Sequence, residues 1–122
     1  MAAHEQIAQT FCNQYYTTFD TNRVAVGSFY APTAVLTFEG VAVTGPEAIV
    51  AKLSTLTFQQ VQHCVTTMDA QLTSAGLLVV VVGQLKADSD QVLGFTQTFH
   101  LAEVDGSLFI ANDVFRLTLH HG

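Results

Sequence analysis

Six apolar residues follow one another without interruption in Leu77–Val82, and four of them are valines. This run predicts a strand that is buried on both faces, because a strand with one face in water alternates apolar and polar residues. The chain then becomes polar, and the segment that follows carries Lys86, Asp88 and Asp90. We therefore expect this strand to leave the hydrophobic body at an acidic rim.

Helical periodicity dominates the part of the chain that precedes this strand. Residues 4–20 carry apolar side chains at three- and four-residue spacing, which predicts an amphipathic helix. Its core-facing stripe is expected to consist of Ile7, Ala8, Phe11, Tyr15 and Phe19. A second short helix is expected over residues 23–30, ahead of Pro32, and Gly45-Pro46-Glu47 is typical of the start of a third.

The strand signals fall into a short hairpin and a long meander. The short strands, residues 34–38 and 41–44, flank Glu39-Gly40, which we interpret as a tight turn. Four longer strands are expected at residues 61–69, 77–86, 93–101 and 108–119, with a turn at Asp105-Gly106. The order predicts a single α+β domain over residues 1–122, with three helices on one face of a curved antiparallel sheet. The other face would need a cover, and a second copy of the chain packed sheet to sheet is the simplest one.

Composition supports this expectation of a homodimer and excludes several function classes. Charged residues are 11% of the 122 residues and hydrophobic residues 49%, whereas a soluble domain has about 25% charged residues. Four Lys and Arg residues with a net charge of −6 argue against direct nucleic-acid binding. We expect no secretory leader, no membrane span and no metal site, and we interpret Cys12 and Cys64 as free buried thiols in a reducing compartment.

Catalytic chemistry has few candidates in the sequence. The possible acid–base groups are His63, Asp69, His100 and Asp113, and no nucleophile, phosphate-loop or zinc motif accompanies them. His63 in an apolar strand is more often a histidine satisfied within the core. For Asp113 we favour an ion pair with nearby Arg116, or a backbone partner, over a general base. Glu39, Asp88 and Asp90 are either ordinary turn residues or carboxylates that bind a partner's basic side chain, and the pattern alone leaves both interpretations open.

Longer segments of the chain resemble a known family. They are FCNQYYTTFDTNR, LTFEG, AIVAKLSTLTFQQVQH, VVGQLKADSD, LGFTQTFHL and NDVFRLTLH, and together they resemble the nuclear transport factor 2 family nearly end to end. The resemblance implies a cone-shaped, cystatin-like α+β fold, a homodimer packed through its sheets, and neither catalysis nor a cofactor. It also implies a carrier that binds the GDP form of the GTPase Ran. Such carriers pass through nuclear pores by weak contacts with phenylalanine-glycine repeats of nucleoporins, and are found in the cytoplasm, in the nucleus and at the nuclear envelope.

The resemblance also implies roles for individual residues. Glu39 would pair with a lysine of Ran, Asp88 and Asp90 with an arginine, and Phe38 would contact an aromatic side chain that enters a pocket mouth. His63 matches a histidine near this region. His4 stands where the family usually has a large aromatic residue for nucleoporin binding, so we expect weaker or relocated repeat binding. The dimer seam would include Val80, Thr98 and Val114.

Two other function classes compete with the carrier. A small-molecule enzyme of the same superfamily, isomerase-like or dehydratase-like, would need a carboxylate base and a hydrogen-bond donor that converge inside the pocket. A domain that only dimerises or scaffolds would leave the acidic rim without a role. A shallow apolar mouth ringed by acids would favour the carrier, and a deep pocket with a buried, raised-pKa aspartate would favour the enzyme.

Overall fold

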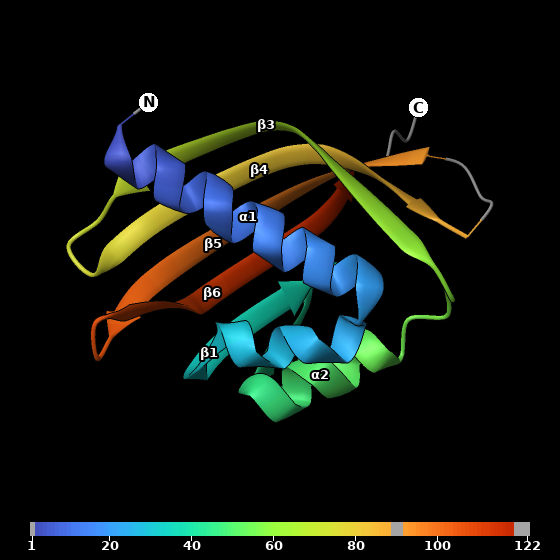
Figure 1. The fold of residues 1–122 in the computed structure, drawn as a ribbon. Helices are drawn as coiled ribbons and strands as arrows, with labels where there is room; N and C mark the ends of the chain where they lie inside the picture. The colour runs from blue at the N-terminus through green and yellow to red at the C-terminus, as the bar shows by residue number, and fades with distance from the viewer. Residues whose placement is uncertain (1, 89–91, 119–122) are drawn as a thin grey trace.

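The computed structural model describes residues 2–88 and 92–118 of the chain. Its elements follow the predicted order of helices and strands (Figure 1). In chain order they are α1 (Ala3–Thr21), the 3₁₀ helix η1 (Arg23–Phe29), β1 (Tyr30–Phe38), β2 (Val41–Thr44), α2 (Pro46–Ser54), β3 (Val61–Leu72), β4 (Gly76–Ala87), β5 (Val92–Val104) and β6 (Ser107–Thr118). No helix in the described part is both long and apolar enough to cross a bilayer.

The strands form one six-stranded sheet in the order β2-β1-β6-β5-β4-β3. The sheet is strongly curved, α1 lies across its concave side, and η1 and α2 lie together near the β1 end (Figure 1). The predicted α+β class is confirmed. One detail of the predicted antiparallel sheet is wrong, because β1 pairs parallel with β6 and makes the sheet mixed. The chain passes through α2 and the meander β3–β6 before β6 reaches β1, and neighbours joined by such a long connection can run parallel.

The buried face of α1 differs slightly from the predicted stripe. Ala8, Cys12, Tyr15, Tyr16 and Phe19 are buried, so the helix faces the sheet along a line that passes through these positions. Ile7 lies at the margin of this line and is 49% exposed, which makes its predicted place in the core wrong. The aromatic members of the line fill the concave side of the sheet.

The sheet bends sharply where β3 faces β4 at Gly83. The register of β3 slips by one residue between Val65 and Thr67, which marks a bulge opposite Gly83. A Cβ at Gly83 would lie 2.4 Å from the carbonyl oxygen of Cys64 and 3.0 Å from the Phe95 ring. A bulge increases local bending, and the bare glycine lets the two backbones approach.

The convex face of the sheet lies opposite the helices and carries an apolar strip among polar residues. Val80 pairs with Thr98, and Thr98 pairs with Val114, so these three residues form a row across β4, β5 and β6. Val82 and Val114 on this face are 43% and 45% exposed. The second buried face that was predicted for the valine strand is therefore open in a single chain.

The two cysteines lie in different environments. Cys12 is buried in the core, and burial raises the pKa of its thiol to about 12. Cys64 is exposed, so its predicted burial is wrong. The reason is strand alternation, which points Cys64 to the face opposite that of its neighbour His63.

Candidate functional site: an apolar cavity with a polar rim

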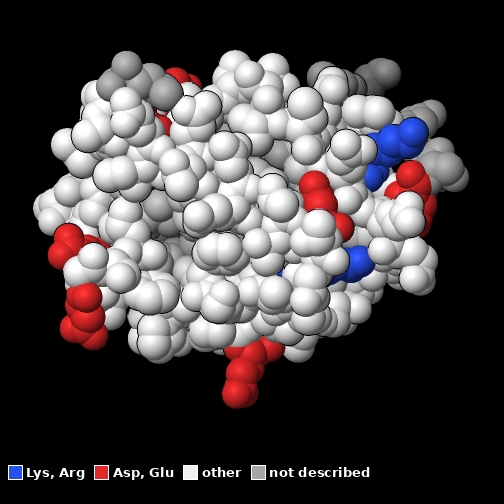
Figure 2. Space-filling model, viewed as in Figure 1, with Lys and Arg blue, Asp and Glu red and all other residues white. Residues whose placement is uncertain are grey.

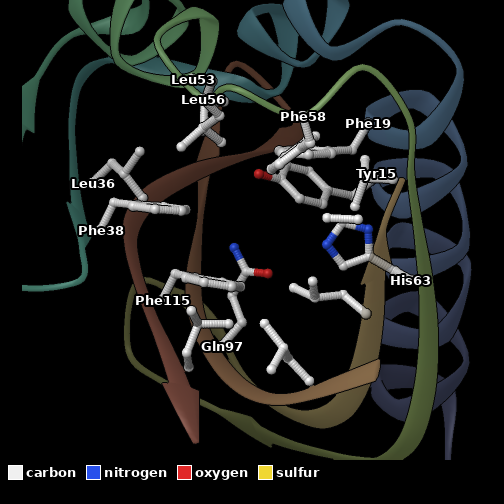
Figure 3. A pocket seen from close by; sticks show the side chains of 15 residues that line it. Tyr15, Phe19, Leu36, Phe38, Leu53, Leu56, Phe58, His63, Gln97 and Phe115 are labelled. Atoms are coloured by element: carbon white, nitrogen blue, oxygen red, sulfur yellow. The ribbon is translucent and has the colours of Figure 1, made fainter. Parts of the chain in front are cut away.

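The concave side of the sheet encloses an apolar cavity of about 200 Å³. It lies between the sheet, the far end of α1, α2 and the loop of residues 55–60 (Figure 3). Most of its wall is aliphatic or aromatic, with Leu36, Phe38, Phe58, Leu85 and Phe115 among the contributors. The polar side chains on its wall are those of Tyr15, His63 and Gln97. An apolar cavity with a few placed polar groups is the usual form of a binding site.

His63 is fixed in the wall of the cavity by Asp20. The Asp20 carboxylate accepts the backbone N–H of His63 at 2.9 Å through Oδ2, and its Oδ1 lies 2.6 Å from the ring Nδ1. The ring packs against Tyr16, Phe19 and Phe95 at centroid distances of 4.9, 5.1 and 5.4 Å. The interpretation of His63 as a histidine satisfied within the core is confirmed. Nothing in the sequence context of Asp20 points to a partner 43 residues away.

A buried hydrogen-bond network lies behind the cavity. The Asp113 carboxylate accepts the Tyr30 hydroxyl at 2.7 Å and the Gln97 amide at 2.8 Å. The Tyr30 and Tyr15 hydroxyls are 2.8 Å apart, and the Tyr16 hydroxyl donates to Gln97 Oε1 at 2.7 Å. Burial raises the pKa of Asp113 to about 6, although its two hydrogen bonds act in the opposite direction. The network holds the polar wall of the cavity in one arrangement.

The predicted ion pair between Asp113 and Arg116 is wrong. Asp113 is buried and Arg116 is exposed on the opposite face, because residues three apart in a strand point to opposite sides. Asp113 also does not line the cavity, since Gln97 and Tyr15 lie on the wall in its place. An enzyme of this fold would need a carboxylate base inside the cavity. A substrate in this cavity would not reach the Asp113 carboxylate. Among the described residues, no three His, Cys, Asp or Glu side chains gather to hold a metal ion.

Phe38 lines the cavity, and Glu39 follows it in the turn after β1. The Phe38 ring stacks on Phe115 with centroids 4.7 Å apart and planes 5° apart. Glu39 has a φ of 49° in the turn before Gly40, as a tight hairpin requires. Its backbone N–H donates to the Phe115 carbonyl, and its Oε1 accepts the backbone N–H of Leu117. The Glu39 carboxylate is therefore fixed to the end of β6 and is not a freely moving side chain.

Asp88 follows Ala87, a residue of the cavity wall, and organises the loop before β3. Its Oδ1 accepts the backbone N–H groups of Gln59 and Gln60 at 3.0 and 2.9 Å, and its own N–H donates to the Gln60 carbonyl at 2.8 Å. Asp88, Asp20 and Lys86 line an open polar depression that shares Val61 with the cavity. Asp90, the other predicted rim aspartate, lies outside the described residues.

Arg23 supports the same loop from the other side. Its guanidinium donates to the carbonyl oxygens of Leu53 and Leu56, both at 3.2 Å, and of Phe58 at 2.8 Å. It also lies 4.2 Å above the Phe58 ring centroid. Arg23 thus positions Leu56 and Phe58, two side chains of the cavity wall. The sequence predicted no role for Arg23, because the carbonyls that it binds belong to an irregular loop 30 to 35 residues away.

Charged groups are sparse around this site. The middle of the helix side is uncharged, acidic groups are scattered around its edge, and its few basic groups lie on the right of the view, where β3 begins and β4 ends (Figure 2). A partner would therefore meet an apolar opening with single carboxylates at its edge.

Residues 7–117 match the family described as the nuclear transport factor 2 (NTF2) domain. The chain belongs to this family. Nuclear transport factor 2 of Emericella nidulans is 46% identical over 121 residues, which cover 96% of this chain and 97% of the relative. Nuclear transport factor 2B of Arabidopsis thaliana is 43% identical over 117 residues, 93% of each chain. The predicted family resemblance is therefore confirmed.

Solved structures of other proteins agree with the fold. The structure of nuclear transport factor 2 from Cryptosporidium parvum is 40% identical, has a TM-score of 0.89 and covers 94% of each chain. The yeast UBP3-associated protein BRE5 is 26% identical, with a TM-score of 0.81 over 98% of this chain and 100% of that one. A putative scytalone dehydratase from Novosphingobium aromaticivorans shares the fold alone, at 16% identity and a TM-score of 0.78 over 97% of this chain and 89% of that one.

Proposed function

We propose that this protein is a nuclear import carrier that binds the GDP form of Ran. The observation that carries the proposal is the similarity to nuclear transport factor 2 over more than nine-tenths of the chain in a plant, in fungi and in a protist structure. The protein would move between cytoplasm and nucleus through weak contacts with phenylalanine-glycine repeats of nucleoporins. A carrier acts by binding alone, so no catalytic step is required of the cavity.

The cavity is suited to an aromatic side chain from the partner. Its volume of about 200 Å³ exceeds the roughly 150 Å³ of an apolar protein cavity that accepts benzene. The stacked pair Phe38 and Phe115 and the ring of Phe58 present apolar surface to such a plug. Burial of the plug would supply the affinity, as anchor residues do at most interfaces.

Carboxylates at the mouth would orient the partner. We assign a lysine of Ran to Glu39 and an arginine to Asp88 and Asp90. The internal hydrogen bonds of Glu39 and Asp88 support this assignment, because carboxylates held in place lose little further freedom when a cation binds. Glu39 Oε2 and Asp88 Oδ2 make no hydrogen bond to a described residue, so these two oxygens would be open to a cation. His63 would contribute apolar ring surface to the wall.

Titration of the protein with Ran loaded with GDP and, in parallel, with a GTP analogue tests the proposal. We expect binding of the GDP form alone, and a fall in affinity with added salt. Glu39→Gln and Asp88→Asn remove the charge but keep the acceptor of the internal bonds. Each variant should therefore fold normally and bind roughly 2- to 5-fold more weakly. Glu103→Gln, an exposed acid outside the cavity, is the matched control. Equal binding of both nucleotide forms, or of neither, would contradict the carrier function.

The convex face of the sheet is the surface that we propose for homodimer formation. Val80, Thr98 and Val114 form one row across three strands, and their neighbour Val82 adds exposed apolar area. The low charge of the whole chain supports the same conclusion, because an exposed apolar patch of this kind is rarely left open in a soluble monomer.

Nucleoporin repeats would bind weakly near the start of α1. His4 is half-buried in the first turn of this helix, and an imidazole gives a phenylalanine less apolar contact than an indole. We expect His4→Trp to strengthen binding of a phenylalanine-glycine repeat peptide in a pull-down or a titration. If His4→Ala leaves the repeat affinity unchanged, His4 has no part in this contact.

A further inference from the structure

We propose that the charge of the His63 ring controls occupation of the cavity, so that an uncharged apolar group binds more weakly as the pH falls. The proposal rests on which ring nitrogen faces the cavity and on what surrounds that atom. The cavity wall is apolar except for Tyr15, His63 and Gln97. Histidine is the side chain whose charge ordinarily changes between pH 5 and 8, which makes His63 the member of this wall that acid would charge.

The proton that charges the His63 ring is gained at Nε2. The other ring nitrogen, Nδ1, lies 2.6 Å from Oδ1 of Asp20, and an ionised carboxylate can only accept a hydrogen bond. Nδ1 therefore carries a hydrogen in the neutral ring as well as in the charged ring. Because Nδ1 faces Asp20, the ring nitrogen that points into the cavity is Nε2 (Figure 3). The charged ring thus presents an N–H group to the cavity.

No side chain of the described residues accepts a hydrogen bond from this N–H group. Oε1 of Gln97 lies on the His63 side of the cavity (Figure 3), but it accepts the Tyr16 hydroxyl at 2.7 Å, and no hydrogen bond joins Gln97 to His63. The His63 side chain is only 4% exposed. None of the described side chains has a fully buried nitrogen or oxygen without a partner, so Nε2 keeps contact with solvent, and water in the empty cavity solvates it.

The ring is held in this orientation by its neighbours. Tyr16 and Phe19 of α1 and Phe95 of β5 pack against it at centroid distances of 4.9, 5.1 and 5.4 Å. The Asp20 carboxylate binds both the ring and the backbone N–H of His63. The ring therefore cannot turn Nε2 away from the cavity without breaking these contacts.

The charged and titratable groups around His63 lie mostly outside the cavity. Asp20 of α1 is the charged side chain in contact with the ring, and it shares an open polar depression with Lys86 and Asp88. Behind the wall, Asp113 is bound to Gln97, and burial raises the pKa of Asp113 to about 6. Asp113 therefore titrates in the same pH range and needs a control of its own.

An apolar occupant displaces the water that solvates Nε2. With the neutral ring, this desolvation affects a single lone pair. With the charged ring, it removes the hydration of an ion and offers no acceptor in exchange, and an aromatic contact returns less than the desolvation of an ion costs. Binding therefore favours release of the proton, and by linkage the affinity for an apolar group falls on acidification.

The same dependence would apply to Ran-GDP, whose aromatic plug is assigned to this cavity. This consequence rests on the proposed carrier function. The pH dependence of the cavity itself does not, and it can be measured with a small molecule in the absence of Ran. The two proposals can therefore fail separately.

Titration of the protein with cyclohexane at pH values from 8 to 5.5, followed by NMR, tests the proposal. Cyclohexane has no titratable group and no π electrons, and the volume of about 200 Å³ exceeds the roughly 150 Å³ of an apolar cavity that accepts benzene. We expect roughly tenfold weaker binding at pH 5.5 than at pH 8, which corresponds to one unit of proton linkage. At pH 6, added cyclohexane should move the ¹⁵N resonances of the His63 ring toward those of a neutral ring.

Two variants separate His63 from Asp113. His63→Phe keeps an aromatic ring and the backbone N–H to Asp20, and it should bind cyclohexane equally well at both ends of the pH range. Asp113→Asn should keep the pH dependence of wild type, and backbone amide spectra of the same samples show whether each variant is folded. Constant affinity or unmoved His63 resonances in wild type, a dependence that survives in His63→Phe or disappears in Asp113→Asn, or no binding at all would each overturn the proposal.

Discussion

Replacement of Asp113 by Asn should stabilise the protein at neutral pH. Asp113 is buried with 1% of its surface exposed, and no cation lies beside it in the described structure. An asparagine can keep both contacts, because its carbonyl can accept the Gln97 amide and its amide can donate to the Tyr30 hydroxyl. Tyr30 would then donate to Tyr15, with which it already shares a hydrogen bond. The substitution thus removes the buried charge and keeps partners for Gln97 and Tyr30, although the Tyr15 hydroxyl hydrogen loses Tyr30 as its acceptor.

The magnitude follows from the pKa of Asp113, which burial raises from 3.8 to about 6. Between these two values the folded protein keeps a proton that the unfolded chain releases, so the free energy of unfolding falls as the pH rises. One pKa unit corresponds to about 1.4 kcal/mol, and the difference from 3.8 to about 6 therefore costs about 3 kcal/mol at pH 7. Below pH 3.8 Asp113 is protonated in both states and costs the folded protein no stability. Above pH 6 the whole cost is present.

Urea unfolding of wild type and Asp113→Asn between pH 3.5 and 8 measures this effect. The other carboxylates and histidines titrate in both proteins, so the difference between the two unfolding free energies isolates Asp113. At equal protein concentration, this difference should rise by about 3 kcal/mol from the acidic to the neutral end in favour of Asn. A difference that does not change with pH would refute the reasoning, because it would mean that Asp113 is equally acidic in the folded and unfolded states.

Three further predictions address the bend, the loop and the convex face. Gly83→Ala should lower the free energy of unfolding by about 1–3 kcal/mol, since its Cβ would meet backbone at 2.4 Å, whereas Gly94→Ala, whose nearest contact is 3.4 Å, should cost less in the same urea assay. In Arg23→Lys, the lysine cannot bind three carbonyls and cover an aromatic ring at once. We expect a clear loss of Ran-GDP affinity, while circular dichroism shows an intact fold. Unchanged affinity would show that the loop keeps its conformation without Arg23. Val114→Asp should shift the protein to monomers in analytical ultracentrifugation while Leu72→Asp, at a 71% exposed position, does not, and identical masses would argue against the convex face as the interface.

The periodicity of the sequence predicted most of the fold, because the burial of apolar residues within one chain determines where helices and strands form. Alternation placed the meander strands to within a few residues, and the turn at Asp105-Gly106 has the positive φ values expected of it. β1 starts at Tyr30, earlier than expected, because Pro32 was taken as the end of a helix. Pro32 is tolerated in β1 since the register with β6 shifts between Tyr30 and Val35, where the missing N–H is not needed.

The polar contacts of the site were beyond prediction from sequence patterns. Asp20 and His63, or Arg23 and the loop carbonyls, are separated by 30 or more residues, and only the packing of α1 on β3 and of η1 on α2 brings them together. Asp113 was predicted to pair with Arg116 because the two residues are close in the sequence. Strand alternation places them on opposite faces of the sheet. The roles of Glu39 and Asp88 at the rim came from family resemblance, while their internal hydrogen bonds needed the three-dimensional structure.

The two edges of the sheet restrict how copies of this protein can assemble. At one edge β2 has four residues, and at the other the longer β3 is interrupted by its bulge near Thr66 and packed against α1. Short, bulged or covered edges resist the addition of a further strand. Growth of the sheet from chain to chain is therefore blocked, and the open apolar surface is a face that a single second copy can cover. A contact of that kind closes on itself by two-fold symmetry, so a chain with few surface charges can remain a small closed particle and not extend into fibres.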